Sequence, residues 1–224
     1  MPFQRLPRWI QFGAFMLAMN AGMINVLGLI SLLHQSVSHM TGNASLLAIH
    51  LVEHDFSSVI FLILVMLSYV LGSSYSGFIL GNSHFKLGRR YGLPLTLVTG
   101  FIVLAWLFIP YYPRYAILWA CAAMGIQNAM VSHYQGAIIR TTHLSGVLTD
   151  LGLSLGYFVR GLKNDSRKII LHLLILFGFI CGSIVAAFSY PYLQLHAFLI
   201  PAGLSLTLSL IYWVLYFRYL NLQM

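Results

Sequence analysis

Two short motifs carry residue types that can bind a polar or charged solute. They read HMTGN at 39–43 and HLSG at 143–146, and each precedes a short apolar stretch. A hydroxyl residue followed by glycine in this position indicates the start of a helix. The first turn of a helix has free backbone N–H groups and the positive end of the helix dipole, so it binds anions. The solute-binding residues predicted from these motifs are Thr41, Gly42, Asn43, Ser145 and Gly146.

Two matched pairs of side chains accompany these motifs. His39 and His143 open them. An imidazole there could relay protons or donate a hydrogen bond to an anion, and the alternative is that it bonds to a nearby carbonyl and caps the loop. Asn25 and Asn128 lie at matching places in two long apolar stretches. A buried amide either bonds to a neighbouring helix or lines a polar cavity. All four residues are candidates for solute binding, and both interpretations stay open here.

Asp150 and Arg140 are the candidates for ion coupling. The chain has 4 acidic residues, and only Asp150 falls within an apolar stretch, one turn after HLSG. An ionisable side chain in a membrane segment is costly and usually serves a function, so Asp150 is predicted to bind a proton or a cation. The alternative is that Asp150 pairs with Arg140 and holds the loop. Arg140 is also suitably placed to attract a carboxylate.

The sequence lacks the motifs of the common enzyme classes. It has no credible Ser/His/Asp spacing, no HExxH and no nucleotide-binding loop. Cys121 and Cys181 lie in apolar stretches without the spacing of metal ligands. We therefore expect no enzymatic activity, no catalytic residue, no cofactor and no metal.

The composition predicts a membrane protein, because 59% of the 224 residues are hydrophobic and 7% are charged. Soluble domains contain about 25% charged residues. A net charge of +8 would suggest nucleic acid as a partner of a soluble protein, but the basic residues lie in short loops between apolar stretches. The expected partners are the lipid bilayer and a small-molecule or ion ligand, not nucleic acid.

Six stretches are long enough to cross a membrane, which takes about 20 apolar residues. They run approximately over 9–33, 56–80, 91–109, 115–138, 169–190 and 197–217. Two further apolar pieces, 43–52 and 147–159, cover roughly half of a bilayer core of about 30 Å. We interpret these two pieces as half-helices, and the sequence leaves open whether they are re-entrant or interfacial.

The lysine and arginine residues predict the orientation. With a cytoplasmic N-terminus and six spans, Arg114 is the only one of the 12 that falls outside. Such a bias is typical of proteins that follow the positive-inside rule. Both termini are therefore expected in the cytoplasm.

An internal repeat organises the predicted spans. GMIN (22–25) corresponds to GIQN (125–128), HMTG to HLSG, and GSSYSGF (72–78) to GSIVAAF (182–188). We therefore predict an all-α polytopic fold within one transmembrane domain, 1–224, with repeats over about 9–109 and 115–217. Three spans per repeat make the second repeat inverted, with a half-helix after the first span of each. Two GxxxG spacings, Gly77–Gly81 and Gly178–Gly182, predict close helix packing.

The stretches VSHMTGN (37–43), AGMIN (21–25), GIQNA (125–129) and SGVLTDLG (145–152) resemble the YoaK-like family. Ser145 stands where a threonine would be expected, and it keeps the hydroxyl. The resemblance covers nearly the whole chain and implies a six-span bacterial inner-membrane protein. It implies no substrate.

Taken together, these features favour a secondary transporter of a small polar solute, with a midplane site between the two half-helix starts. An organic anion and proton coupling are the candidate substrate and driving mechanism. The alternatives are a small channel, or a membrane assembly or structural protein without transport. The sequence leaves open the substrate, the coupling ion, the direction of transport and any homo-oligomer.

Overall fold

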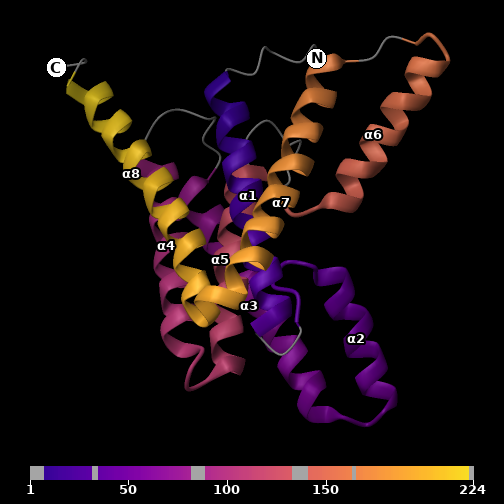
Figure 1. The fold of residues 1–224 in the computed structure, drawn as a ribbon, viewed down its shortest axis with the longest axis vertical. Helices are drawn as coiled ribbons and strands as arrows, with labels where there is room; N and C mark the ends of the chain where they lie inside the picture. The colour runs from indigo at the N-terminus through magenta and orange to yellow at the C-terminus, as the bar shows by residue number, and fades with distance from the viewer. Residues whose placement is uncertain (1–7, 32–34, 82–88, 133–140, 163–164, 222–224) are drawn as a thin grey trace.

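The computed structural model describes residues 8–31, 35–81, 89–132, 141–162 and 165–221, and every regular element in them is helical. Figure 1 shows a bundle of long helices with two shorter helices beside it. The elements are α1 (Arg8–Ser31), α2 (Met40–Val52), α3 (Phe56–Leu80), α4 (Arg89–Phe108), α5 (Pro113–Ser132), α6 (Leu144–Val159), α7 (Ser166–Leu193), η1 (Gln194–Phe198) and α8 (Leu199–Asn221).

The long helices match the predicted apolar stretches and make the protein a multi-pass membrane protein. Within the described residues, five stretches of helix are long and apolar enough to cross a bilayer, and the last of them, 166–218, covers α7 and most of α8. Large apolar side chains cover the surface of these helices, as at Phe78, which is 85% exposed. An apolar surface of this extent indicates lipid as the surrounding solvent.

The two predicted short helices exist as α2 and α6, but each begins three residues earlier than predicted. His39 and His143 precede the first helical residues, and their carbonyl groups accept the first helical hydrogen bonds, from the N–H groups of Asn43 and Val147. The hydroxyl–glycine pairs therefore lie inside the first turn. Figure 1 shows both helices starting near the mid-height of the bundle, with α2 and α6 running toward opposite ends.

Glycines allow α1 and α7 to cross at backbone contact. A Cβ atom on Gly22 would collide with the carbonyl of Phe179, and a Cβ on Gly182 would collide with the carbonyl of Met19. Gly178 faces Phe15 on the same side of α7. The GxxxG spacing in α7 therefore packs closely against α1, as predicted.

The crossing of α3 and α5 uses the corresponding residues of the other half of the chain. A Cβ on Gly125 would collide with the carbonyl of Tyr69, and one on Gly72 would collide with the carbonyl of Ala122. Gly125 and Gly72 are the counterparts of Gly22 and Gly182 in the sequence repeat. Both crossings thus join a helix of one half to a helix of the other.

The glycines of the other GxxxG spacing, Gly77–Gly81, do not pack against another helix, so the prediction of close packing was wrong there. A Cβ on Gly77 would meet no described atom within 4 Å. Gly81 instead ends α3 with φ 54°, a conformation that glycine adopts without strain. The spacing alone does not reveal whether a glycine faces a helix or lipid, which depends on the orientation of the helix.

We predict that Gly22→Ala and Gly125→Ala each destabilise the protein, because the new methyl group forces two helix backbones apart. Overpacking of this kind costs about 1–3 kcal/mol. The matched control is Gly77→Ala, which adds a methyl group in open space and favours the helix by about 0.5–1 kcal/mol. Thermal unfolding in detergent measures the difference, and equal midpoints for Gly22→Ala and Gly77→Ala would contradict the described crossing.

Candidate functional site

Asn25 holds the segment that leads into α2. Its Nδ2 donates to the Ser38 hydroxyl at 2.7 Å and to the Ala21 carbonyl at 2.9 Å. Its Oδ1 accepts from the Ser38 backbone N–H at 3.0 Å and from the Ser36 hydroxyl at 3.1 Å. This amide therefore has both donors and its acceptor occupied by protein atoms.

Asn128 does the same for the segment that leads into α6. Its Nδ2 donates to the Thr142 hydroxyl at 2.7 Å and to the Tyr69 hydroxyl at 2.8 Å, and its Oδ1 accepts from the Thr141 hydroxyl at 3.0 Å. Ser38 and Thr142 each stand immediately before the histidine of their motif. The two halves thus use one arrangement, and no motif in the sequence predicted these hydroxyl partners.

Asn43 supports the same segment from the first turn of α2. Its side chain is buried, and its Nδ2 donates to the Ser36 carbonyl at 3.1 Å. It therefore braces the loop together with Asn25. In the described structure, Asn25, Asn43 and Asn128 all use their amide groups to satisfy protein atoms rather than to line open space.

The histidines at the two helix starts are on the surface and make no capping hydrogen bond among the described residues. The His39 imidazole lies against Gly42, where a Cβ would collide with Nδ1, whereas Gly146 faces open space. Thr41 and Ser145 are exposed as well. The imidazole and hydroxyl side chains at both helix starts are therefore exposed.

The two helix starts are not joined by contact, since the described residues of α2 pack on α3, those of α6 pack on α7, and α2 and α6 do not touch. Arg140, the predicted anion partner, lies outside the described residues. A site shared by both starts, as the sequence suggested, therefore remains a prediction.

Asp150 has a partner that was not predicted from the sequence. His172 on α7 is buried, and its Nε2 lies 3.6 Å from Oδ2 of Asp150 on α6. The Asp150 side chain itself is 56% exposed. The sequence feature that could have indicated this partner is His172 itself, a histidine within an apolar span. Only the packing of α6 on α7 shows which carboxylate it meets.

A buried amide pair links α1 to α5. Asn20 Nδ2 donates to Gln127 Oε1 at 3.0 Å, and Gln127 Nε2 donates to the Leu17 carbonyl at 2.9 Å. Both side chains are inaccessible to solvent, and Oδ1 of Asn20 has no hydrogen-bond partner in the described part of the chain. A buried acceptor without a partner costs about 1–3 kcal/mol, so it requires an explanation.

An apolar cavity of about 660 Å³ lies between α1, α4, α5 and α8. It occupies the end of the bundle where α1 begins and α8 ends (Figure 1). At the opposite end, buried side chains of α4, α5, η1 and α8 fill the corresponding space. The lining residues are Trp9, Ile10, Phe12, Gly13, Ala14, Leu17, Tyr91, Leu95, Met130, Val131, Leu208, Ile211, Tyr212 and Leu215.

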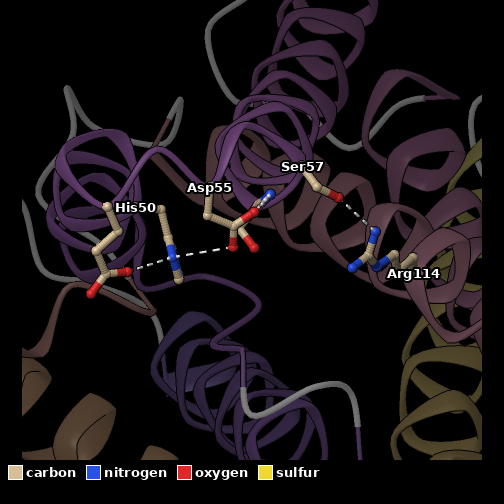
Figure 2. Close-up of polar contacts among 6 residues, drawn as sticks. His50, Asp55, Ser57 and Arg114 are labelled. Carbon is tan, nitrogen blue, oxygen red and sulfur yellow. Dashed lines mark hydrogen bonds and ion pairs between the residues drawn. The ribbon is translucent and has the colours of Figure 1, made fainter.

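Polar contacts also gather where α2 ends and α3 begins. Figure 2 shows the His50 imidazole facing Asp55, with Nδ1 3.6 Å from the carboxylate, and Nδ1 is also 3.3 Å from Glu53. Hydrogen bonds from the Ser58 side chain and backbone lower the pKa of the Asp55 carboxyl, which caps α3. No metal-binding group of three ligands occurs among the described residues. This cluster ties α2 to α3.

Comparison with known proteins places the chain among proteins of unassigned activity. A family model described as "Protein of unknown function (DUF1275)" matches residues 13–211. The "UPF0700 transmembrane protein YoaK" of Bacillus subtilis (strain 168) is 23% identical over 184 residues, which cover 79% of this chain and 82% of that protein. No solved structure matches. The resemblance noted from the sequence motifs is thus confirmed.

We predict that Asn25→Ala and Asn128→Ala destabilise the protein by similar amounts, about 1–3 kcal/mol each, because each leaves buried polar groups unsatisfied. Ser45→Ala is the control, since Ser45 is exposed and bonds only within α2. Thermal midpoints in detergent test the ranking. An Asn25→Ala midpoint equal to that of Ser45→Ala would show that Asn25 does not anchor the segment before α2.

Proposed function

The chain belongs to the DUF1275 family of proteins of unknown function, and we propose that it is a six-span secondary transporter of a small polar solute in the bacterial inner membrane. Six spans follow if the stretch 166–218 crosses twice, once as α7 and once as α8. At 53 residues this stretch is more than twice the length that one crossing needs, about 20 residues. Gln194, with φ 49°, marks the break between the two helices.

The repeated contacts support an inverted repeat. The glycine crossing of α1 with α7 has its counterpart in that of α5 with α3, and the Asn25 anchor has its counterpart in Asn128. Helices α4 and α8 pack on each other, as two equivalent elements do across a two-fold axis. Two repeats of three spans each run in opposite directions through the membrane, which is an architecture of secondary transporters.

The observation that carries the proposal is the difference between the two ends of the bundle. Cavity space of about 660 Å³ separates α1 from α8 at one end, whereas α4 and α5 enclose a filled core at the other. A carrier that works by alternating access has this property, because its central region communicates with one side at a time. Exchange of the packing between two similar halves would open the opposite side.

The basic residues support an inward-facing state. Arg160, Arg167, Lys168 and Arg218 lie at the end of the bundle that contains the cavity, and Arg114 lies at the opposite end. Lysine and arginine gather on the cytoplasmic side of membrane proteins. The cavity therefore faces the cytoplasm in this proposal, and so do both termini.

Asp150 and His172 support proton coupling. Among the described acidic residues, Glu53, Asp55 and Asp165 lie at or just beyond helix ends, and Asp150 lies within a helix. A carboxylate and an imidazole 3.6 Å apart form a unit that binds or releases a proton. The Asp150 side chain is 56% exposed, so protein atoms do not enclose its carboxylate.

We predict that Asp150→Asn and His172→Gln abolish solute-driven proton movement, because each removes one half of the pair. Proteoliposomes with a pH-sensitive dye inside would be challenged with amino acids, organic acids, amides and polyols. Glu53→Gln is the control, since it removes a carboxylate at the other end of the bundle. Full activity in both variants would exclude the Asp150–His172 pair from coupling. A conductance that does not saturate with solute concentration would instead indicate a channel.

We predict that cysteine labelling places both ends of α7–α8 in the cytoplasm. In a Cys121→Ala/Cys181→Ala background, Arg160→Cys and Arg218→Cys react with a membrane-impermeant maleimide only from the cytoplasmic side. Tyr112→Cys reacts only from the outside. Labelling of Arg160→Cys and Arg218→Cys from opposite sides would contradict two crossings in the stretch 166–218.

A further inference from the structure

Polar side chains follow the cavity-lining residues along each helix. Residues three or four apart on a helix share one face, so the next turn beyond each cavity-lining residue also faces the bundle interior. On each of the four lining helices, that next turn carries an uncharged polar side chain, and each of these four side chains is buried. The lining residues and their polar neighbours are Leu17 with Asn20, Leu95 with Thr99, Met130 with Gln127, and Leu208 with Ser205.

The polar layer defined by Asn20, Thr99, Gln127 and Ser205 consists of two linked pairs. Asn20 donates to Gln127 at 3.0 Å, and Thr99 donates to Ser205 at 3.0 Å. Gln127 also holds the carbonyl of Leu17, which lines the cavity. The layer thus lies one helical turn beyond residues that line the cavity.

One acceptor in this layer has no partner. Oδ1 of Asn20 is buried and accepts no hydrogen bond from the described residues, although Nδ2 of the same amide is engaged by Gln127. A buried acceptor is normally satisfied by protein, water or ligand. A solute with an N–H or O–H group would satisfy it.

The chemistry of the walls restricts the solute. Apart from two tyrosines, the lining residues are apolar, and the layer beyond them contains only amides and hydroxyls. A charged solute would find no opposite charge among these described residues, and burying an unpaired charge is strongly unfavourable. An apolar body in the cavity with a neutral donor group at the layer would be fully accommodated.

We propose that the cavity and the polar layer together form the solute site, and that the solute is a small uncharged molecule with an apolar body and a hydrogen-bond donor, such as a short-chain amide. This inference rests on the proposed transport function and names its substrate class. The apolar body contacts Leu17, Leu95 and Met130, and the donor reaches Oδ1 of Asn20. Trp9 and Phe12, both exposed, flank the cavity and give an apolar solute access from the bilayer.

The test compares three probes that have the same six-carbon skeleton and different head groups: hexanamide, hexanoate and hexylammonium. Thermal midpoints are measured in lipid nanodiscs, where a ligand of the folded state raises the midpoint saturably. Hexanamide is expected to raise it, and the two charged probes are not. An equal effect of all three probes would overturn the inference, because it would reflect partition into lipid.

Two variants locate the binding. Gly13→Leu places a side chain into the cavity, and Gly100→Leu is its control, because both glycines have open space around a Cβ and only Gly13 lines the cavity. Asn20→Ala removes the acceptor. Gly13→Leu is expected to abolish hexanamide binding, Asn20→Ala to weaken it about tenfold, as for one hydrogen bond, and Gly100→Leu to leave it unchanged. Binding that survives in Gly13→Leu would overturn the inference.

Flux measurements separate this inference from the proposed function. Saturable hexanamide uptake into proteoliposomes that Gly13→Leu abolishes would support both. Hexanamide binding with the expected variant pattern, but without uptake, would keep the site and exclude transport of this probe. Saturable uptake of a charged solute that is equal in Gly13→Leu and Gly100→Leu would keep the transporter and overturn the site.

Discussion

The segments that lead into α2 and α6 lie outside the helices, so their polar groups need hydrogen-bond partners from other parts of the chain. In this protein Asn25 and Asn128 supply such partners. Each amide bonds to the segment before a short helix, and Ser38 and Thr142 take the same place in the two halves. The starts of α2 and α6 near the mid-height of the bundle depend on these contacts (Figure 1).

The glycine crossing of α5 with α3 brings Asn128 to one of its partners. Gly125 lets α5 approach α3 at Tyr69, and the Tyr69 hydroxyl then accepts from Asn128. At the other crossing, Gly22 lets α1 approach α7, and α7 also carries His172, which faces Asp150. The same glycine packing therefore occurs on a helix that meets the Asn128 anchor and on a helix that carries one member of the ionisable pair.

Charged and uncharged chemistry are separated in space. Asp150 and His172 lie where α6 packs on α7, whereas Asn20 and Gln127 lie between α1 and α5 beside the apolar cavity. Carboxylates keep water or a counter-charge nearby because burying them alone is costly. Amides pair with each other and tolerate an apolar setting. This division suits a carrier in which a proton and a neutral solute bind at different places.

The sequence by itself determined the long helices and the two short ones, because hydropathy and glycine punctuation are local properties of the chain. It also identified Asn25, Asn128 and Asp150 as polar groups that need partners. Only the tertiary structure decided those partners: Ser38, Thr142 and His172 depend on which helix faces come together. The tertiary structure also decided that Gly182 packs and Gly77 does not, and that a cavity forms between α1, α4, α5 and α8, since contact and empty space belong to the assembled bundle.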